Sequence, residues 1–428
     1  MVATVGTLSC SPMFSRRTEW KLEPNRFTLA HREMLRAGRE ILDLTISNPT
    51  RAGIQYDEAA ILDALRNPKS LDYDPQPKGL LSARQAVAEY YAGVSHPGLT
   101  NRECLDPESL ILTTSTSEGY SYVFRLLCNP EDEVLVPKPS YPLFDFLADL
   151  QDVKLTGYPL IYDHGWQIDW PSLESAVSER TRAVVVVNPN NPTGSYVSAE
   201  ERARLNELCA KHGLAMIVDE VFLDYAHSVS HPLKTAKERA LSLSKGGAAS
   251  APEVESFVTN QAALSFTLSG LSKISALPQM KLAWIAVSGP EEETNAAIER
   301  LEVIADTYLS LSAPVQLAGS KLLEQRKKIQ PQLIQRVRIN VAELDRQLAA
   351  QTVCTRLEVE GGSYAVLRVP ATRSDEDLAI ELLQQCSVLV HPGHFYDFPR
   401  DGYLVLSLIA QEEEFRRGIS LLLKFLNQ

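Results

Sequence analysis

The sequence predicts an α/β fold with a mostly parallel sheet that is flanked by helices. Two continuous apolar runs, residues 184–187 and 214–218, have the composition of strands buried on both faces of such a sheet. The first run is followed by the turn-forming loop 188–194 (NPNNPTG), and the second by Asp219 and Glu220. Because the carboxyl ends of parallel strands open onto one crevice, side chains from both ends are expected to meet there.

Length and charge limit the classes of protein to which the chain can belong. At 428 residues it is long enough for a large core and for two domains. The net charge of −12, with no basic block, argues against nucleic acid or an anionic membrane as a partner. No apolar run has the length of a membrane span. Nucleic-acid-binding and membrane-spanning proteins are therefore not the expected classes.

The N-terminal residues and the cysteines indicate a cytoplasmic protein. Residues 1–16 lack the basic start and the long apolar core of a signal peptide, so they are expected to form a flexible leader. The six cysteines show no CxxC pair and no regular spacing, which is typical of free thiols in a reducing compartment.

The first part of the chain contains two predicted helices and a strand. One helix is expected at residues 25–37, with Gly38 as its stop, and an amphipathic helix at 80–91. A Pro-rich loop that begins at Tyr73 precedes the second helix. A strand is predicted at residues 110–114.

An anion-binding site is predicted where that strand gives way to a helix ending near Leu127. Ser115, Thr116 and Ser117 occupy the start of this helix. Unpaired N–H groups and the helix dipole both favour negative charge at such a place. Plain capping by the same hydroxyls is an alternative interpretation, and capping and anion binding can coexist.

Lys273 is the candidate reactive residue. An apolar run ends in a small-residue turn at residues 269–270, Lys273 follows, and a second strand begins at residues 282–287. A lone lysine in this position is usually a solvated turn residue. Here the crevice is expected to contain Asn191 and Asp219 as well, which favours a functional lysine.

A second Ser-Lys pair, Ser244-Lys245, lies in a stretch of different composition. Residues 231–255 are rich in small residues and are predicted to be a surface insertion. Lys245 has no flanking strands and is followed by two glycines, whereas a reactive lysine needs a fixed, partly desolvated position. Lys273 is therefore preferred.

The C-terminal part is predicted to form a smaller α+β domain. Helical segments extend from Pro290 to about Ala349, and three strands and a final helix follow. These strands are expected at residues 361–369, 386–391 and 403–408. His391 and His394 form a pair without further ligands, so no metal site is expected. The predicted division is a leader (1–16), an N-terminal segment packing on the small domain (17–50), a large domain (51–310) and the small domain (311–428).

These features resemble the class I/II aminotransferases, enzymes of pyridoxal 5′-phosphate (PLP) fold type I similar to aspartate aminotransferase. The resemblance rests on three motifs that occur in the family's order: NPNNPTG (188–194), DEVFLDY (219–225) and SGLSK…K…W (269–284). Weaker similarity extends from about residue 41 to the C-terminus. The resemblance implies a seven-stranded-type sheet in a large PLP-binding domain, and a homodimer.

By this resemblance, Lys273 and Asp219 are the catalytic residues. Lys273 would bind PLP as a Schiff base and later move the substrate proton, and Asp219 would keep the pyridine nitrogen protonated. Asn191 would donate a hydrogen bond to the 3′ oxygen of the ring. Tyr141, which by itself would be interpreted as a core residue, would stack on the ring.

The family also implies which residues hold the cofactor phosphate. Ser115, Thr116 and Ser117 would bind it together with the ammonium group of Lys281. In the homodimer, Tyr73 would reach the phosphate in the partner's site. An ordinary packed tyrosine is the alternative for Tyr73.

Several positions depart from the family's pattern, among them Ser115, where the family often has glycine. Phe222 replaces a tyrosine that contacts the 3′ oxygen, Gly270 a serine, Ser47 a glycine and Lys281 an arginine. The largest departure is Val405, which occupies the position of an arginine that binds the substrate α-carboxylate in a bidentate pair.

A valine cannot bind a carboxylate, so two explanations for Val405 remain. Another cation replaces the arginine, and Arg51, Arg368 and Arg400 are candidates because they lie near the site loops in sequence. Otherwise, the substrate is not an ordinary α-amino acid.

The sequence favours a PLP-dependent aminotransferase that moves an amino group from an amine or amino acid to a 2-oxo acid or other carbonyl by a ping-pong mechanism. A PLP-dependent lyase performing β-elimination or decarboxylation is an alternative, because the fold does not decide between these reactions. A PLP-binding sensor without turnover is less favoured, because the chain has no basic segment for DNA binding.

Overall fold

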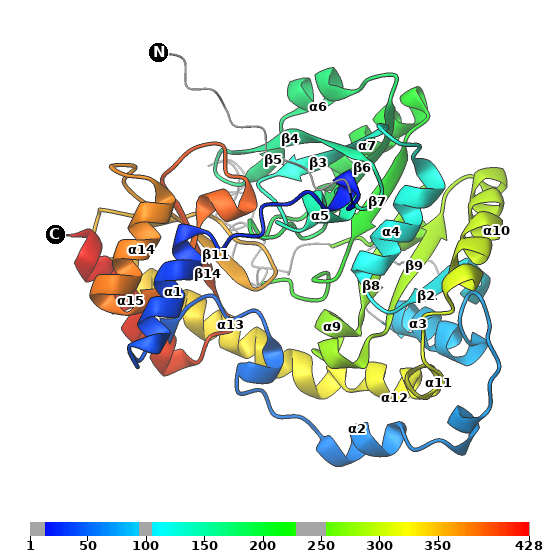
Figure 1. The fold of residues 1–428 in the computed structure, drawn as a ribbon, viewed down its shortest axis with the longest axis horizontal. Helices are drawn as coiled ribbons and strands as arrows, with labels where there is room; N and C mark the ends of the chain where they lie inside the picture. The colour runs from blue at the N-terminus through cyan, green and yellow to red at the C-terminus, as the bar shows by residue number, and fades with distance from the viewer. Residues whose placement is uncertain (1–12, 94–104, 228–253, 428) are drawn as a thin grey trace, which may run out of the picture.

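The computed structural model describes residues 13–93, 105–227 and 254–427, which fold around an eight-stranded and a four-stranded sheet (Figure 1). Lys245 and most of the predicted insertion lie outside the described residues. Within these ranges, no helix has the length and apolar character needed to span a membrane.

The larger sheet has the strand order β2-β9-β8-β7-β6-β3-β4-β5 in the described part of the chain. Its strands are β2 (Leu110–Thr113), β3 (Glu133–Lys138), β4 (Lys154–Tyr162), β5 (Trp166–Ile168), β6 (Thr181–Val187), β7 (Ala215–Asp219), β8 (Ser265–Gly270) and β9 (Ala283–Ser288). The pairings from β8 through β7, β6 and β3 to β4 are parallel, whereas those that involve β2, β9 and β5 are antiparallel. The predicted α/β fold with a mostly parallel sheet is confirmed. The sequence did not predict β5, a three-residue hairpin partner of β4.

Helices cover both faces of this sheet because residues along each strand alternate between the faces. In β7, Ile217 packs towards α4 (Thr116–Leu127) and α10 (Glu291–Tyr308). Its neighbour Val218 packs in a separate cluster with residues of α7 (Ala199–His212) on the opposite face. Both faces of β7 are therefore buried, as its continuous apolar sequence predicted.

The end of β8 differs from the prediction. Ser269 and Gly270 pair with Trp284 and Ala283 of β9, so the small-residue turn predicted at residues 269–270 is wrong. The one-turn helix α9 (Leu271–Ile274) follows the strand directly. A Cβ at Gly270 would lie 2.8 Å from the Cβ of Ala283, so the close approach of β8 and β9 leaves no room for a side chain here.

The smaller sheet is antiparallel and has the order β10-β11-β14-β13 in the described residues. Its strands are β10 (Thr355–Arg356), β11 (Tyr364–Arg368), β13 (His391–Pro392) and β14 (Tyr403–Ser407). The long helix α13 (Arg326–Leu348), yellow in Figure 1, extends from the larger sheet to this C-terminal unit. A smaller C-terminal α+β unit is therefore confirmed.

The N-terminal segment lies against the C-terminal unit. Strand β1 (Leu42–Asp43) pairs in parallel with β12 (Val388–Leu389). Helix α1 (Arg26–Arg36) packs against α14 (Asp375–Cys386). The domain boundaries near residues 16, 50 and 310 remain predictions.

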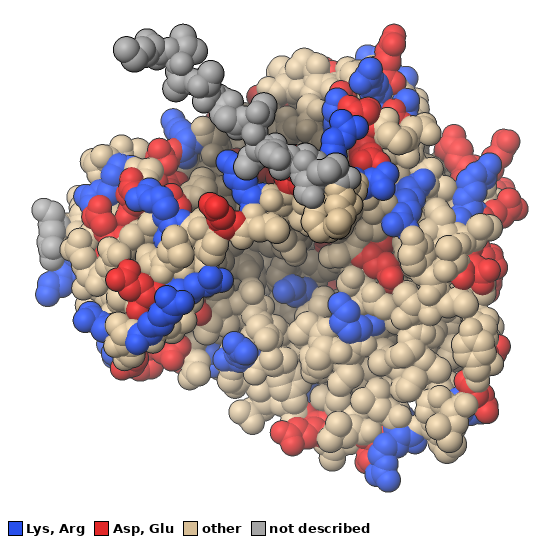
Figure 2. All heavy atoms as spheres, viewed as in Figure 1, with Lys and Arg blue, Asp and Glu red and all other residues tan. Residues whose placement is uncertain are grey.

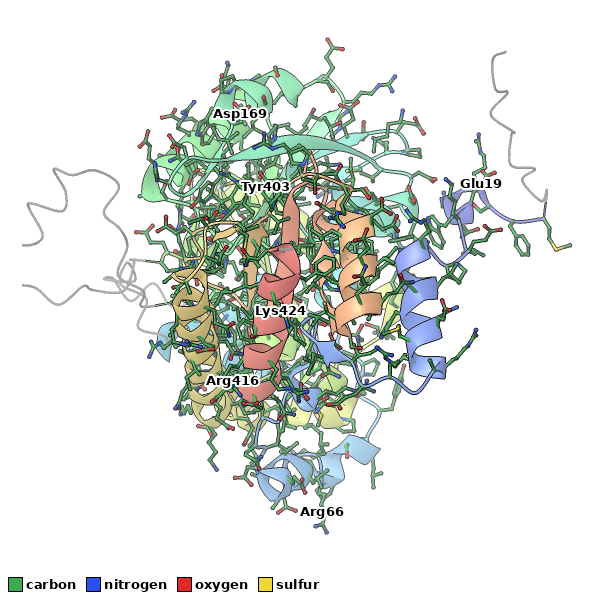
Figure 3. All side chains as sticks on the ribbon, turned by 90° about the vertical axis from the view of Figure 1, so that its left-hand side faces the viewer. Glu19, Arg66, Asp169, Tyr403, Arg416 and Lys424 are labelled. Atoms are coloured by element: carbon green, nitrogen blue, oxygen red, sulfur yellow. The ribbon has the colours of Figure 1, made fainter. Side chains whose placement is uncertain are left out.

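Figure 3 shows this end of the molecule from the side. Helix α15 (Glu412–Leu426) packs against both α13 and α14, and it carries Arg416 and Lys424. The face of α15 that is turned away from these two charged residues is apolar. It includes Phe415 and Leu422, which are buried in the same core as α1 and β1. The first and last segments of the chain therefore share one core.

The N-terminus of α7 provides a test of local stability. Ser198 Oγ accepts a hydrogen bond from the Glu201 N–H at 3.2 Å, and the Glu201 carboxylate accepts one from the Ser198 N–H at 2.9 Å. Ser198→Ala should lower the free energy of unfolding by about 1 kcal/mol because it removes this reciprocal cap. Denaturant unfolding at fixed protein concentration measures the change. Ser175→Ala, at an exposed hydroxyl in α6 (Trp170–Ala176), should change stability by less than about 0.5 kcal/mol; equal losses in both variants would contradict the prediction.

Candidate active site

A cavity of about 310 Å³ lies at the carboxyl ends of β6, β7 and β8. Every residue predicted to bind the cofactor lines this cavity, with the exception of Tyr73: Ser115, Thr116, Ser117, Tyr141, Asn191, Asp219, Phe222, Lys273 and Lys281. The topology explains this convergence, because parallel strands deliver the loops that follow them to one edge of the sheet.

Asp219 is the buried carboxylate of the cavity. It ends β7 and is 8% exposed. Its Oδ1 accepts a hydrogen bond from the Val221 N–H at 3.2 Å, and its Oδ2 accepts one from the Tyr120 hydroxyl at 3.3 Å. Burial raises the pKa of Asp219 from 3.8 to about 6, although both donors and the charge of Lys273 oppose the change. A cation beside this carboxylate would therefore be strongly favoured.

Glu220, the next residue, faces away from the cavity, as strand alternation predicts. Its carboxylate accepts hydrogen bonds from the Ser256 hydroxyl at 2.5 Å and from the Phe257 N–H at 2.7 Å. Burial raises the pKa of Glu220 to about 7. Its contacts connect β7 to the segment before β8, which is a structural function.

Lys273 lies on α9 and is half-buried. Its ammonium nitrogen is 5.1 Å from the centroid of the Phe222 ring. Burial lowers the pKa of Lys273, and the negative charge of Asp219 only partly opposes this change. A lowered pKa leaves more of the amine unprotonated, which is the form that attacks a carbonyl carbon.

An anion site lies at the N-terminus of α4. Ser115 is the N-cap, and its Oγ accepts a hydrogen bond from the Glu118 N–H at 3.2 Å. Thr116 and Ser117 line the cavity, and their hydroxyls make no hydrogen bond to another residue that the structure describes. Lys281 adds a positive charge at the same cavity. The free N–H groups, the helix dipole and the ammonium together fit a phosphate group.

Asn191 and Asn190 have different surroundings in the NPNNPTG loop. The Asn190 amide donates to the Pro139 carbonyl and to the Thr193 hydroxyl, so it stabilises the loop itself. Asn191 lines the cavity, and its Oδ1 is buried without a hydrogen-bond partner among the described residues. Because the two ends of an amide can exchange places, this side chain can offer either a donor or an acceptor to a bound group.

Aromatic rings form the apolar part of the wall. Tyr141, Phe222 and Tyr364 line the cavity, and Tyr141 packs edge-on against Phe144 at 5.8 Å. Burial and the charge of Asp219 raise the pKa of Tyr141 to about 12, so its hydroxyl stays neutral. A planar ring can therefore be stacked here without an adjacent phenolate charge.

Two predicted features lie apart from the cavity. Tyr73 is 86% exposed and lines a separate pocket of about 290 Å³ beside residues 309–316. His391 Nδ1 lies 3.0 Å from the Tyr396 hydroxyl, and burial lowers the pKa of His391 to about 4. Within the described part of the chain, no cluster of three His, Cys, Asp or Glu side chains suits a metal ion.

None of the three candidate arginines lines the cavity. Arg368 lies over the Tyr162 ring at 5.6 Å, Arg400 donates to the Tyr403 hydroxyl at 3.5 Å, and Arg51 is exposed. Among the described lining residues, the charged groups are those of Asp219, Lys273 and Lys281.

Val405 does not face an open site. It is 1% exposed and belongs to an apolar cluster with Tyr364, Val366 and Tyr396. Packed aromatic and aliphatic side chains thus surround the position that the family resemblance assigned to a carboxylate-binding arginine.

Sequence reasoning missed several lining residues. Tyr120 lies four residues after Thr116, so helical spacing would have placed it on the face of α4 that points to the cavity. Thr114 and Ser272 adjoin predicted residues, and only their sequence proximity pointed to them. Tyr364 comes from the smaller sheet, and no local signal connects it to the site.

Taken together, the donor set fits PLP. The cavity combines a buried carboxylate for a ring nitrogen, an amine for a carbonyl carbon, an unpaired amide, aromatic faces and an anion site at a helix N-terminus.

Comparisons with known proteins show the family to which the chain belongs. The sequence matches the family described as aminotransferase class I and II over residues 39–416, and the chain belongs to this family. Enzymes of the family depend on PLP. The glutamate-pyruvate aminotransferase AlaA of Haemophilus influenzae is 27% identical over 419 residues, which cover 93% of this chain and 94% of that protein.

Two further relatives extend the comparison. The structure of an alanine aminotransferase from Pyrococcus furiosus has a TM-score of 0.78 at 21% identity and covers 93% of this chain and 95% of its own, which shows the shared fold. An S-alkyl-thiohydroximate lyase from Arabidopsis thaliana is 31% identical over 276 residues, or 63% of this chain and 53% of that protein. The predicted aspartate-aminotransferase-like fold and aminotransferase class are confirmed.

The raised pKa of Asp219 predicts a pH-dependent stability of the apoprotein. Between pH 3.8 and about 6 the native state keeps the proton that the unfolded chain loses, so this group's contribution to stability falls as the pH rises. Above pH 6 the buried charge should destabilise the fold by about 3 kcal/mol. Asp219→Asn should therefore be more stable than the wild type at pH 7.5 and nearly equal to it at pH 4.

Thermal unfolding of the apoprotein at several pH values measures this difference. Asp163→Asn, at an exposed position, is the matched control and should follow the wild type at every pH. A stability difference for Asp219→Asn that does not change between pH 4 and 7.5 would contradict the assignment.

Proposed function

We propose that this chain binds PLP in the cavity and transfers an amino group between an amine or amino-acid donor and a 2-oxo acid or other carbonyl acceptor. One observation supports the proposal most directly. Lys273 and Asp219 line the same cavity, and burial moves their pKa values towards each other, with the lysine lowered and the aspartate raised. Aminotransferase chemistry needs a nucleophilic amine, which the lowered pKa of Lys273 favours. It also needs a carboxylate that pairs with a protonated ring nitrogen, and such a cation would supply the counter-charge that the buried Asp219 lacks.

When bound, PLP would supply an electron sink for the charge that develops when a bond at the donor carbon breaks. Lys273 would anchor the cofactor carbonyl and then hold and return the proton at the donor carbon. Asp219 would keep its charge beside the ring nitrogen, with Tyr120 and the Val221 N–H as fixed donors. The amide of Asn191 would orient the ring by a hydrogen bond to its oxygen substituent.

The phosphate of the cofactor would be held by Ser115, Thr116 and Ser117 at the start of α4, and by Lys281. Tyr141 would cover one face of the ring. Because Lys281 donates from a single ammonium group, it binds a phosphate without the bidentate geometry of an arginine. Among the described residues that line the cavity, Lys281 is the exposed cation that a substrate would meet.

We also propose a homodimer in which Tyr73 completes the site of the partner subunit. Tyr73 and Leu71 are 86% and 90% exposed, and Leu309 beside the same pocket is also exposed. Figure 2 shows a largely uncharged area right of centre in the lower half of this face, with charged groups along its lower and lower-right edge. Large apolar and aromatic side chains that are exposed favour association with another protein surface.

The free thiols support a cytoplasmic location as part of the same proposal. Cys128, Cys209, Cys354 and Cys386 are unpaired in the described part of the chain. Reduced cysteines are usual in a reducing compartment.

A PLP-dependent lyase is the second candidate function. The similarity to S-alkyl-thiohydroximate lyase and the apolar surroundings of Val405 favour a substrate that is not an ordinary α-amino acid. The same proton transfer at Lys273 would serve β-elimination, because only the group that leaves the substrate differs.

The visible spectrum of the purified protein during titration with donors tests the proposal. The panel contains alanine, glutamate, aspartate, aromatic amino acids and amines without a carboxylate. Conversion of the cofactor to its amino form, followed by its recovery with pyruvate or 2-oxoglutarate, is the expected result. Release of ammonia and a keto acid without that conversion would instead support the lyase.

Replacement of the two candidate lysines tests the site itself. Lys273→Ala should abolish covalent attachment of PLP and lower the rate of transamination by at least about a thousandfold, because nucleophile and proton carrier are lost together. Lys245→Ala is the matched control and should keep both properties. Loss of attachment in Lys245→Ala, with normal attachment in Lys273→Ala, would overturn the assignment of the lysine.

A further inference from the structure

The helix that carries Lys273 cannot fix its own position. α9 has only four residues, so most of its carbonyl groups have no partner within the helix. Backbone N–H groups of Ser275 and Ala276 reach the carbonyls of Leu271 and Lys273 at 3.2 and 3.1 Å. Other groups must hold the rest of the segment.

Three side chains supply these additional donors. The Tyr225 hydroxyl donates to the Lys273 carbonyl at 2.7 Å, and Gln330 Nε2 donates to the Ile274 carbonyl at 2.9 Å. The Tyr56 hydroxyl donates to the Ala276 carbonyl at 2.9 Å. The donors lie 48, 56 and 220 residues away from their acceptors along the chain. Three distant parts of the molecule therefore converge on one short segment.

The backbone of this segment is held in a conformation that it would not prefer. Ala276 has φ +49° and is 1% exposed. Residues with a Cβ seldom adopt this left-handed region, and they keep it only where the surroundings enforce it. The hydroxyl of Tyr56 binds the carbonyl of this same residue.

The donors are themselves fixed. Gln330 Nε2 also donates to Asp224 Oδ2 at 2.5 Å, and Asp224 Oδ1 accepts a hydrogen bond from the Tyr90 hydroxyl at 2.9 Å. Tyr225 is 5% exposed. Its ring packs edge-on against Phe222 with the centroids 6.0 Å apart.

Tyr225 therefore contacts the backbone of Lys273 and also supports the ring that lies near its side-chain nitrogen. Its hydroxyl binds the backbone carbonyl of the lysine, and its ring supports Phe222, whose ring lies 5.1 Å from the lysine nitrogen. Gln330 belongs to α13, the helix that extends to the smaller sheet, so it connects the position of α9 to that unit.

We propose that Tyr225, Gln330 and Tyr56 are positioning residues that hold the Lys273 amine in the cavity. None of the three lines the cavity, and all three bind the backbone that carries the lysine. The inference rests on the proposed function of Lys273 as the cofactor-binding lysine. Its physical basis is that displacement of a reacting group by about 1 Å can lower a rate by about a hundredfold.

Tyr225→Phe tests the proposal with Tyr158→Phe as its control. Tyr158 is 1% exposed, and its hydroxyl donates to the Val185 carbonyl at 2.8 Å, so each variant loses one buried hydrogen bond to a backbone carbonyl. The two variants should show similar decreases in the midpoint of thermal unfolding. They should differ only in the behaviour of Lys273.

The readout is the rate at which PLP attaches to Lys273 in the apoprotein. Borohydride reduction at successive times traps the attached form, and mass spectrometry of peptides measures it. Tyr225→Phe should slow attachment and lower kcat of the first half-reaction, each by about tenfold, with KM changed less than about twofold. Tyr158→Phe should leave attachment and kcat unchanged.

Equal attachment rates in Tyr225→Phe and Tyr158→Phe would overturn the proposal, whatever the thermal midpoints. The attachment assay needs no substrate, so its outcome is separate from that of the proposed function. If the wild type attaches PLP at Lys273 but converts no donor, the proposed reaction fails, and slower attachment in Tyr225→Phe still supports the positioning function.

A second pair of variants tests Gln330. Gln330→Leu should also slow attachment, whereas Gln347→Leu, near the other end of the same helix, should not, because that side chain donates to the Arg416 carbonyl at 3.0 Å. The double variant Tyr225→Phe/Gln330→Leu should slow attachment by less than the product of the single effects, because both donors act on one segment. Fully multiplicative effects would show that the two side chains act independently, contrary to the proposal.

Discussion

Desolvation of Asp219 and Lys273 in the crevice at the ends of β7 and β8 is the constraint on which the rest of the site depends. Burial raises the pKa of Asp219 and lowers that of Lys273, so it favours the neutral form of each group. Neither group has a direct ion-pair partner among the described residues. The fold tolerates the free-energy cost of burying these groups because they lie at or just after the ends of central strands that bury many apolar side chains. An active site is commonly such a region, where local stability is lower so that a ligand can supply the missing interaction.

The parts of the site that the sequence revealed are those that follow strands. The residues after β6 and β7 were predictable because apolar runs are visible locally and parallel strands bring their ends together. Helical spacing could have placed Tyr120 beside the cavity, but its hydrogen bond to Asp219 depends on the packed fold. Tyr225 was not predictable, because it acts through one hydrogen bond to the distant Lys273 carbonyl. The prediction of a turn at residues 269–270 was wrong for a related reason. The small residues there allow β8 and β9 to pair closely, and in the sequence alone such residues look the same as those of a turn.

The smaller sheet takes part in the site as well as packing beside it. Tyr364 of β11 lines the cavity, and the N–H groups of Glu360 and Gly361 donate to the Gly194 carbonyl at 3.1 and 2.8 Å. Gly194 has φ +71°, and a Cβ there would lie 2.5 Å from the Gly361 oxygen, so this contact requires glycine. The loop that presents Asn191 is thus anchored by the C-terminal unit, and the geometry of the cavity depends on how the two units sit together.

The packing around Val405 has a consequence for how this protein can evolve. Phe398 and Tyr403 stack with their centroids 4.5 Å apart in the cluster that encloses Val405. An arginine at this position would be confined among the rings of this cluster, whose described members carry no counter-charge, so the single substitution would destabilise the fold before it aided function. A change of substrate class by this route would need at least one compensating change in the cluster first. The order of mutations, and not only their identity, would therefore limit which relatives of this protein natural selection can reach.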